Sequence, residues 1–204
     1  MATGETDVSI CADALVLLGA TAISSFADGT EAAGIAERLY PGIRDMTLSM
    51  YPWSFTLGKA QLQRLSGSPT NEWRYWYAMP SDTLTGLPRA VYISASFNDP
   101  LNYDWEIYEG RLLTNETSIY VDYQRRPSVA EMPGYFTQLM RYMLAWHLAE
   151  PITDQTEKGL YWRNIATGGE GQNDRGGFFR QAASIDGQGQ PPRNFEDFTL
   201  IGVR

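Results

Sequence analysis

The sequence is poor in the residues on which most catalytic and metal sites depend. It has one cysteine, Cys11, and one histidine, His147, in 204 residues. A single cysteine excludes an internal disulfide framework, and the two residues together are too few for a zinc site of usual composition. Cys11 lies among apolar residues of an expected helix, so a buried, inert thiol is expected. His147 follows apolar positions along a helical face, which favours a core or interface histidine over a catalytic base.

Positive charge is missing from the first part of the chain. No lysine or arginine precedes Arg38, and the formal net charge is -8. The acidic residues of this segment are Glu5, Asp7, Asp13, Asp28, Glu31 and Glu37. Gripping nucleic acid by its phosphates needs clustered lysine and arginine, so such a protein is not expected. The acidic segment suits either a solvated face that keeps the protein soluble or a wall past which DNA slides without sticking.

The sequence also lacks a long apolar run and a phosphate-binding loop. The most apolar N-terminal stretch, 14–23, is too short to span a bilayer and has no basic flank. We therefore expect that the protein is made in the cytoplasm and does not associate with a membrane. The glycine-rich stretches 168–171 and 186–189 lack the Lys-Ser or Lys-Thr of a phosphate loop. No cofactor, no metal and no enzymatic activity are expected.

Hydrophobic periodicity predicts four helices. They cover residues 6–18, 30–51, 133–150 and 154–168. Thr6 suits the N-cap position of the first helix, and both Asp28 and Thr30 suit that of the second. Pro41 is expected to kink the second helix. Pro151 is expected to end the third helix after Glu150.

The ends of two of these helices carry further expectations. Asp154 with Glu157 is expected to cap the fourth helix. Trp53 and Phe55 follow the second helix directly, after Pro52. Two large rings at that position favour a plug at the end of a core over a ligand-stacking site.

The pattern changes to strands between residues 55 and 126. Strands are predicted over 57–65, 73–79, 90–95, 104–108, 111–114 and 118–124. Glu109-Gly110 between two of them is typical of a two-residue hairpin turn. The fold class expected is therefore α+β. It is an antiparallel four-helix core with one small antiparallel β-sheet inserted and an extended C-terminal arm. The expected segments are 1–55 for the N-terminal helical hairpin, 56–130 for the inserted β region, 131–168 for the C-terminal helix pair and 169–204 for the arm.

The expected arm, 169–204, carries large apolar residues between its glycines. They are Phe178, Phe179, Phe195, Phe198, Leu200 and Ile201. Such a segment either packs on its own domain or becomes ordered on a partner, and the residues alone leave both open.

The sheet region carries aromatic rings on both faces of one strand. Alternation puts Trp73, Tyr75 and Tyr77 on one face and Trp76 on the other. One set can fill the core, and the other is where a neighbouring subunit could dock, so Trp73 and Trp76 are candidate partner-binding residues. Together with Tyr103 and Trp105, the same rings could instead form a sugar-stacking platform.

Carboxylates in the sheet region leave one further alternative open. They are Asp104, Glu106, Glu109, Glu116 and Asp122. Two of them could lie at the separation found in glycosidases, so a cell-wall hydrolase remains an alternative, although nothing in the sequence selects a pair.

Several short motifs, in order, resemble one family. They are Ala14-Leu15-x-x-Leu18-Gly19, Ile23-x-Ser25-x-x-Asp28, Ala33, Tyr40-Pro41-x-x-Arg44-Asp45-x-x-Leu48, Pro52-Trp53-x-Phe55, Tyr75-x-Tyr77-x-x-Pro80-x-Asp82, Val121-Asp122-Tyr123-x-x-Arg126 and Leu144-Ala145-x-x-Leu148-Ala149-x-Pro151-Ile152-Thr153. Between residues 10 and 165 the chain resembles the tail tubular protein A family, the head-to-tail adaptors of short-tailed bacteriophages.

The resemblance implies a structural virion protein at the head-tail interface. It implies a homo-oligomeric ring, a dodecamer, between the portal protein and the tail tube or nozzle protein. DNA would pass through the central channel during genome ejection without sequence-specific binding. It also implies that the C-terminal arm reaches the portal, with Phe178, Phe179, Phe195, Phe198 and Leu200 as candidate anchors. From residue types alone, a carbohydrate- or receptor-binding tail module remains an alternative.

Overall fold

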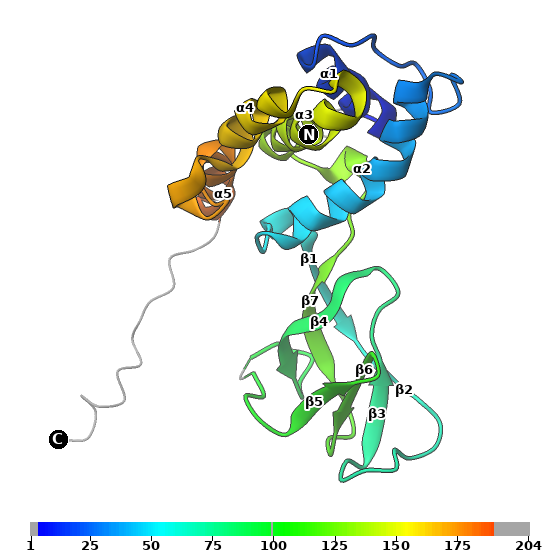
Figure 1. Cartoon of the computed structure of the whole chain (residues 1–204). Coiled ribbons are helices and arrows are strands. Elements are labelled where there is room, and N and C mark those ends of the chain that lie inside the picture. The colour runs from blue at the N-terminus through cyan, green and yellow to red at the C-terminus, as the bar shows by residue number, and fades with distance from the viewer. Residues whose placement is uncertain (1–3, 99, 190–204) are drawn as a thin grey trace, which may run out of the picture.

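Helices and strands occupy separate parts of the molecule (Figure 1). The computed structural model describes residues 4–98 and 100–189, and within them it contains five α-helices and two small antiparallel sheets. The helices form one part, which we call the helical body, and the strands form a second part, the β module. The expected α+β class is therefore confirmed.

The first two helices begin where their caps predict. α1 (Asp7–Leu17) starts after Thr6, whose hydroxyl accepts from the Ser9 amide at 3.1 Å while the Ser9 hydroxyl accepts from the Thr6 amide at 2.9 Å. α2 (Glu31–Ser49) starts after Thr30, whose hydroxyl accepts from an amide one turn later. Each cap satisfies donors that the first turn of a helix leaves without partners.

The third helix passes the proline that was expected to end it. α3 (Gly134–Thr153) continues through Pro151, so the prediction of an end after Glu150 is wrong. A proline removes one backbone donor, and in the last turn little helix remains to be disrupted. The Thr153 hydroxyl donates to the carbonyl of Ala149 at 2.6 Å and helps to hold that turn together.

The short connection to the fourth helix also differs from the expectation. Asp154 has a φ of 50° and forms the C-cap of α3, so it does not cap α4 (Thr156–Thr167) with Glu157. Aspartate tolerates the left-handed conformation better than most residues, which suits it to a helix end. Gly168, with a φ of 89°, ends α4 as predicted.

A fifth helix occupies part of the segment that was expected to be an extended arm. A 3-10 turn, η3 (Glu170–Gln172), precedes α5 (Gly177–Gly187). Phe179, Ala182 and Asp186 are buried at intervals of three and four residues, so one face of α5 lies against the helical body. The helical body therefore contains five helices rather than four, and the expectation of an extended chain from residue 169 is wrong over 177–187.

The strands form two sheets where one was expected. In the first sheet, β1 (Leu57–Gln61) and β4 (Thr83–Tyr92) flank β7 (Tyr120–Arg125). The second has the order β2 (Gln63–Arg64), β3 (Tyr75–Ala78), β6 (Arg111–Thr114) and β5 (Trp105–Tyr108). The chain changes sheets at Leu62, which is buried and donates its amide to the Ile119 carbonyl at 2.8 Å.

The predicted hairpin between β5 and β6 is present. Glu109 and Gly110 both have positive φ, 51° and 72°, as a two-residue turn of type I′ requires.

Each part has its own hydrophobic core. In the helical body, α3 packs against α1, α2, α4 and α5 and is buried along most of its length. The core of the β module consists of Leu62, Tyr77, Val91, Leu112, Ile119, Val121 and Tyr123. The chain enters the β module through β1 and leaves it through β7, so the two parts meet at the ends of these two neighbouring strands.

Candidate functional site

Aromatic rings fill the junction between the helical body and the β module, which we call the joint. Trp53 has no exposed surface and donates its indole N–H to the Thr47 carbonyl at 3.2 Å. Its ring contacts Tyr51, Phe136 and Phe179 edge-on, with centroid distances of 4.9, 5.2 and 5.9 Å. The predicted plug at the end of the core is therefore confirmed.

A buried carboxylate attaches α5 to the joint. Asp186 is 3% exposed and accepts from the Ser54 amide at 2.8 Å, the Ser54 hydroxyl at 2.7 Å and the Tyr135 hydroxyl at 2.5 Å. Burial, followed by the bond to Asp186, raises the pKa of Tyr135 well above its usual value, so its hydroxyl stays protonated and donates. Asp186 thus joins α5 to the 3-10 turn Ser54–Thr56, which precedes β1, and to the first turn of α3.

A polar cluster forms the outer side of the joint. The guanidinium of Arg126 donates from Nε to both oxygens of Asp45 at 3.1 Å and from Nη2 to Oδ2 at 2.8 Å. The Arg126 amide donates to the Asp82 carbonyl at 2.8 Å, and the Tyr123 hydroxyl donates to the Asp82 carboxylate at 3.0 Å. Three segments that are distant in sequence are connected through these four residues.

A side chain from the β module satisfies the end of α2. Gln124 is 7% exposed, and its Nε2 donates to the carbonyls of Leu48 at 2.7 Å and Tyr51 at 3.0 Å. The last carbonyls of a helix have no partner within the helix, so Gln124 supplies donors that water would otherwise provide.

The four candidate partner-binding residues that the structure describes do not form one surface. Trp73 donates to Glu106 at 3.1 Å, and Trp76 donates to the Ser66 carbonyl at 3.2 Å. Phe178 contacts the Tyr142 ring at 5.3 Å and Phe179 is buried in the helical core, so both pack on their own domain. Phe195, Phe198 and Leu200 lie outside the described residues.

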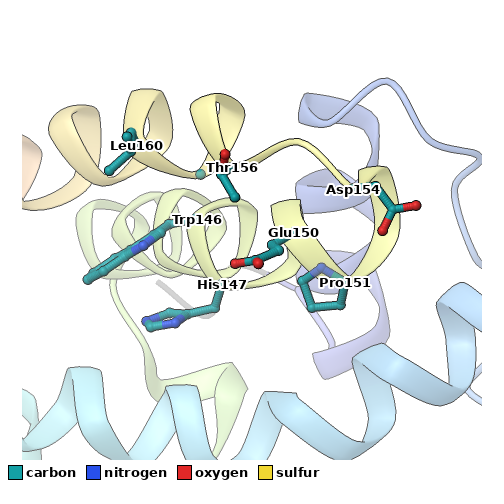
Figure 2. A pocket seen from close by; sticks show the side chains of 8 residues that line it. Trp146, His147, Glu150, Pro151, Asp154, Thr156 and Leu160 are labelled. Atoms are coloured by element: carbon teal, nitrogen blue, oxygen red, sulfur yellow. The ribbon is translucent and has the colours of Figure 1, made fainter.

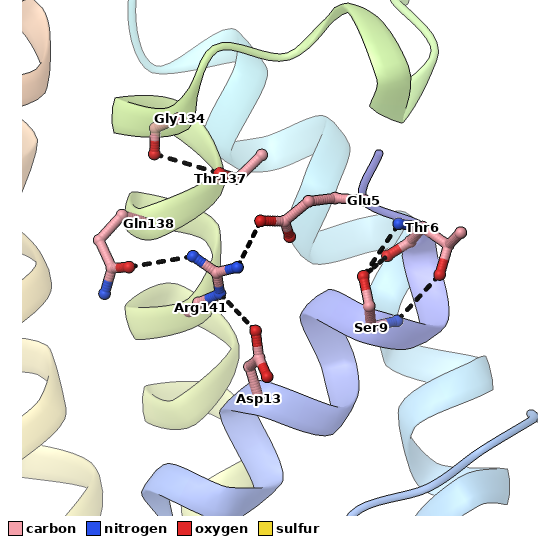
Figure 3. Close-up of polar contacts among 8 residues, drawn as sticks. All are labelled: Glu5, Thr6, Ser9, Asp13, Gly134, Thr137, Gln138 and Arg141. Atoms are coloured by element: carbon pink, nitrogen blue, oxygen red, sulfur yellow. Dashed lines mark hydrogen bonds and ion pairs between the residues drawn. The ribbon is translucent and has the colours of Figure 1, made fainter. Parts of the chain in front are cut away.

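The acidic N-terminal segment is partly used in internal contacts. Arg141 of α3 donates to Glu5 at 2.5 Å, to Asp13 at 2.8 Å and to Gln138 at 3.0 Å (Figure 3). Asp7 accepts from the Tyr40 hydroxyl at 2.6 Å. Several of the negative charges thus fix α1 to its neighbours.

The sheet carboxylates are engaged separately rather than as a pair. Glu106 is on β5 and accepts from Trp73. Asp122 is on β7, in the other sheet, and accepts from Lys59 at 2.7 Å and Tyr92 at 3.2 Å. Within residues 4–98 and 100–189, no three or more histidine, cysteine or acidic side chains are grouped as a metal site.

An open pocket of about 560 Å³ lies along α3 and α4 (Figure 2). Its lining comprises Trp146, His147, Glu150, Pro151, Asp154, Thr156, Gly159 and Leu160. The sequence analysis did not find it, although helical spacing aligns positions 146, 150 and 154 on one face. We call it the α3–α4 pocket.

His147, at the edge of this pocket, is in an apolar setting. Its ring stacks on Trp146 with a centroid distance of 4.3 Å, and burial lowers the pKa of the imidazole. Its Nε2 is buried and has no hydrogen-bond partner within the described part of the chain. A neutral, ring-stacked histidine fits the predicted core or interface role.

No protein-family model matches the chain, and no curated protein sequence matches it. No helix among the described residues is long and apolar enough to cross a membrane.

Proposed function

We propose that this chain is a head-to-tail adaptor of a short-tailed bacteriophage, a structural virion protein without enzymatic activity. The observation that carries the proposal is the joint. Asp45, Asp82, Tyr123 and Arg126 belong to three separate motifs of the resemblance, and they contact one another there. The meeting of these motifs in one polar cluster supports the proposal.

A further motif of the resemblance supports the same proposal. Trp53 and Phe55 belong to Pro52-Trp53-x-Phe55 and fill the inner side of the joint. Four motifs of the resemblance thus contribute residues to the joint, where the β module meets the helical body. A connector needs a fixed relation between its parts, because one part must contact the portal and another the tail.

In the proposed assembly, copies of this chain form a ring, a dodecamer, between the portal protein and the tail tube or nozzle protein. The helical body, with its core of antiparallel helices, and the β module supply the lateral contacts. The C-terminal residues 190–204, which carry the candidate anchors Phe195, Phe198 and Leu200, engage the portal. DNA passes through the channel without sequence-specific binding.

The test is the mass of the purified chain in solution, alone and mixed with the portal ring encoded by the same phage. Light scattering is expected to show a ring-sized complex with the portal. A chain ending after Gly189 keeps α5 and its bonds at Asp186, so its fold is expected to persist while portal binding is lost. A full-length chain that ignores the portal at every concentration contradicts the proposal.

A carbohydrate-binding module is the second candidate, and one feature of the β module favours it. A small pocket of about 120 Å³ lies between Trp76 and Tyr108, beside Arg111. Tyr108 is 55% exposed, and the Arg111 guanidinium lies 4.6 Å from the Trp76 ring centroid. An exposed ring beside a polar group is typical of sugar sites. Saturable glycan binding that Trp76→Ala abolishes would favour this candidate over the adaptor.

A further inference from the structure

The α3–α4 pocket combines an apolar wall with negative charge that has no partner among the described residues. Trp146 and Pro151 line it, and Leu160 at its edge is 57% exposed. Glu150 and Asp154 line it as well, and neither has an ion pair or a side-chain hydrogen bond within residues 4–98 and 100–189. At about 560 Å³, its volume is within the range of about 300–1,000 Å³ common for binding pockets. Its chemistry suits a large apolar side chain with a cation beside it.

A surface of that kind is present on β4. Leu87 is 55% exposed, and Arg89 is exposed two positions later. Leu87 and Arg89 are both exposed, while Gly86, Pro88 and Ala90 beside them are partly buried, so both side chains lie on the exposed side of β4, whose register shifts around Pro88. β4 is at the edge of its sheet, and Arg89 has no ion pair within the described part of the chain. We call this pair of side chains the β4 knob.

The pocket and the β4 knob are on different parts of one molecule. The chain enters the β module just after Ser54, which lies near Tyr135 at the start of α3 because both residues donate to Asp186. Glu150 is fifteen positions later, which corresponds to about 22 Å along the helix. β4 belongs to the β module (Figure 1), so one copy does not fill its own pocket.

We propose that the α3–α4 pocket of one copy receives the β4 knob of a second copy. Leu87 enters beside Trp146 and Leu160, and Arg89 pairs with Glu150 and Asp154. This contact joins two different surfaces, so it is heterologous, and repeating it generates a ring when the rotation closes. The inference rests on the proposed adaptor function, because it assigns the lateral contact of that ring.

Site-directed cross-linking tests the contact directly. Thr85→Cys places a thiol beside the β4 knob, and Thr156→Cys places one in the pocket wall; both positions are exposed. The native Cys11 has no exposed surface and does not compete. The two full-length variants are mixed and treated with a short bis-maleimide. We expect the 85–156 heterodimer in at least several-fold excess over the product of Thr85→Cys with the exposed control Thr70→Cys.

Substitutions within this pair identify the groups that act. Leu87→Asp is expected to reduce the 85–156 product several-fold, whereas Val16→Asp, at a position of similar exposure (58%), leaves it unchanged. Arg89→Glu is expected to reduce the product, and Glu150→Arg in the second chain is expected to restore it. Equal yields with the Thr70→Cys control, or indifference to Leu87→Asp, would overturn the contact.

Failure of this contact and failure of the adaptor function give different results. If Leu87→Asp chains still assemble on the portal ring, the lateral contact is elsewhere and the adaptor function stands. If the 85–156 product forms but the wild-type chain ignores the portal ring, the self-contact stands and the adaptor function falls.

Discussion

Arg126 and Asp45 are 81 positions apart, yet the guanidinium contacts both oxygens of the carboxylate at 2.8–3.1 Å. The pair connects the end of β7 to the C-terminal part of α2. Both side chains are about one-third exposed, so water weakens the Coulomb attraction while the two-pronged geometry keeps the partners aligned. The main effect of the pair is therefore to fix the orientation of the β module.

The first prediction concerns this pair. Arg126→Ala is expected to lower the free energy of unfolding by about 1 kcal/mol or less, since the pair is partly exposed. Arg126→Lys keeps the positive charge but loses the two-pronged guanidinium geometry, so it should recover only part of the stability that Arg126→Ala loses. Urea denaturation of the three single variants, Arg126→Ala, Arg126→Lys and Asp45→Ala, and of the two double variants measures the coupling energy between positions 126 and 45. Additive effects would show that the pair does not act as a unit.

The second prediction concerns the aromatic plug. Trp53→Ala removes a fully buried ring that contacts five other aromatic rings, and it is expected to cost about 3–5 kcal/mol. Tyr103→Ala is the matched control, because that ring is 81% exposed and its removal should change stability by about 0.5 kcal/mol or less. Urea denaturation followed by circular dichroism measures both. Similar losses for the two variants would contradict the role of Trp53.

The third prediction concerns the attachment of α5. Asp186→Asn places an amide where three donors converge on a carboxylate, so at least one buried group loses its partner, at about 1–3 kcal/mol. Tyr135→Phe removes a single bond and should cost less. In the Asp186→Asn variant, amide hydrogen exchange is expected to accelerate, relative to wild type, more in α5 than in α1. Exposed Gln181→Ala on the same helix is the control and should leave that exchange unchanged.

The fourth prediction concerns pH. The Arg125 guanidinium, followed by the Ser128 amide and hydroxyl, holds the pKa of Glu131 at about 2, below its ordinary 4.5. A lowered folded-state pKa stabilises the protein above about pH 4.5, and this contribution is lost as the pH falls towards 2.

The corresponding measurement compares wild type with Glu131→Gln. Because the carboxylate is 44% exposed, the difference in unfolding free energy should be about 1 kcal/mol or less at pH 7. It should shrink between pH 4.5 and pH 2. Glu72→Gln, at an exposed carboxylate without an ion pair in the described residues, should show no such trend. A difference that stays constant across this range would refute the assignment.

Local signals in the sequence predicted the elements best. The caps at Thr6 and Thr30, the hairpin at Glu109-Gly110 and the end of α4 at Gly168 depend on neighbouring residues, and all are confirmed. The predicted end of α3 at Pro151 failed because a proline in the last turn has little helix to disrupt.

Features that depend on distant residues were not predictable in the same way. The glycines around α5 led to the prediction of an extended segment, although Phe179, Ala182 and Asp186 have helical spacing. The helix is held in place by the contacts of Asp186 with Ser54 and Tyr135, which are distant in sequence. Division of the strands into two sheets depends on the long-range pairing of Leu62 with Ile119. The α3–α4 pocket likewise arises only when two helices meet.

Leu57 and Gln124, the residues at which the chain enters and leaves the β module, are opposite each other in the β1–β7 ladder. The helical body is therefore connected to the module as it would be to a single hairpin, with both ends at one place. A segment inserted in this way can lengthen, shorten or be exchanged between related chains without moving any helix. The outer end of the molecule can thus diversify while the helical framework is inherited unchanged.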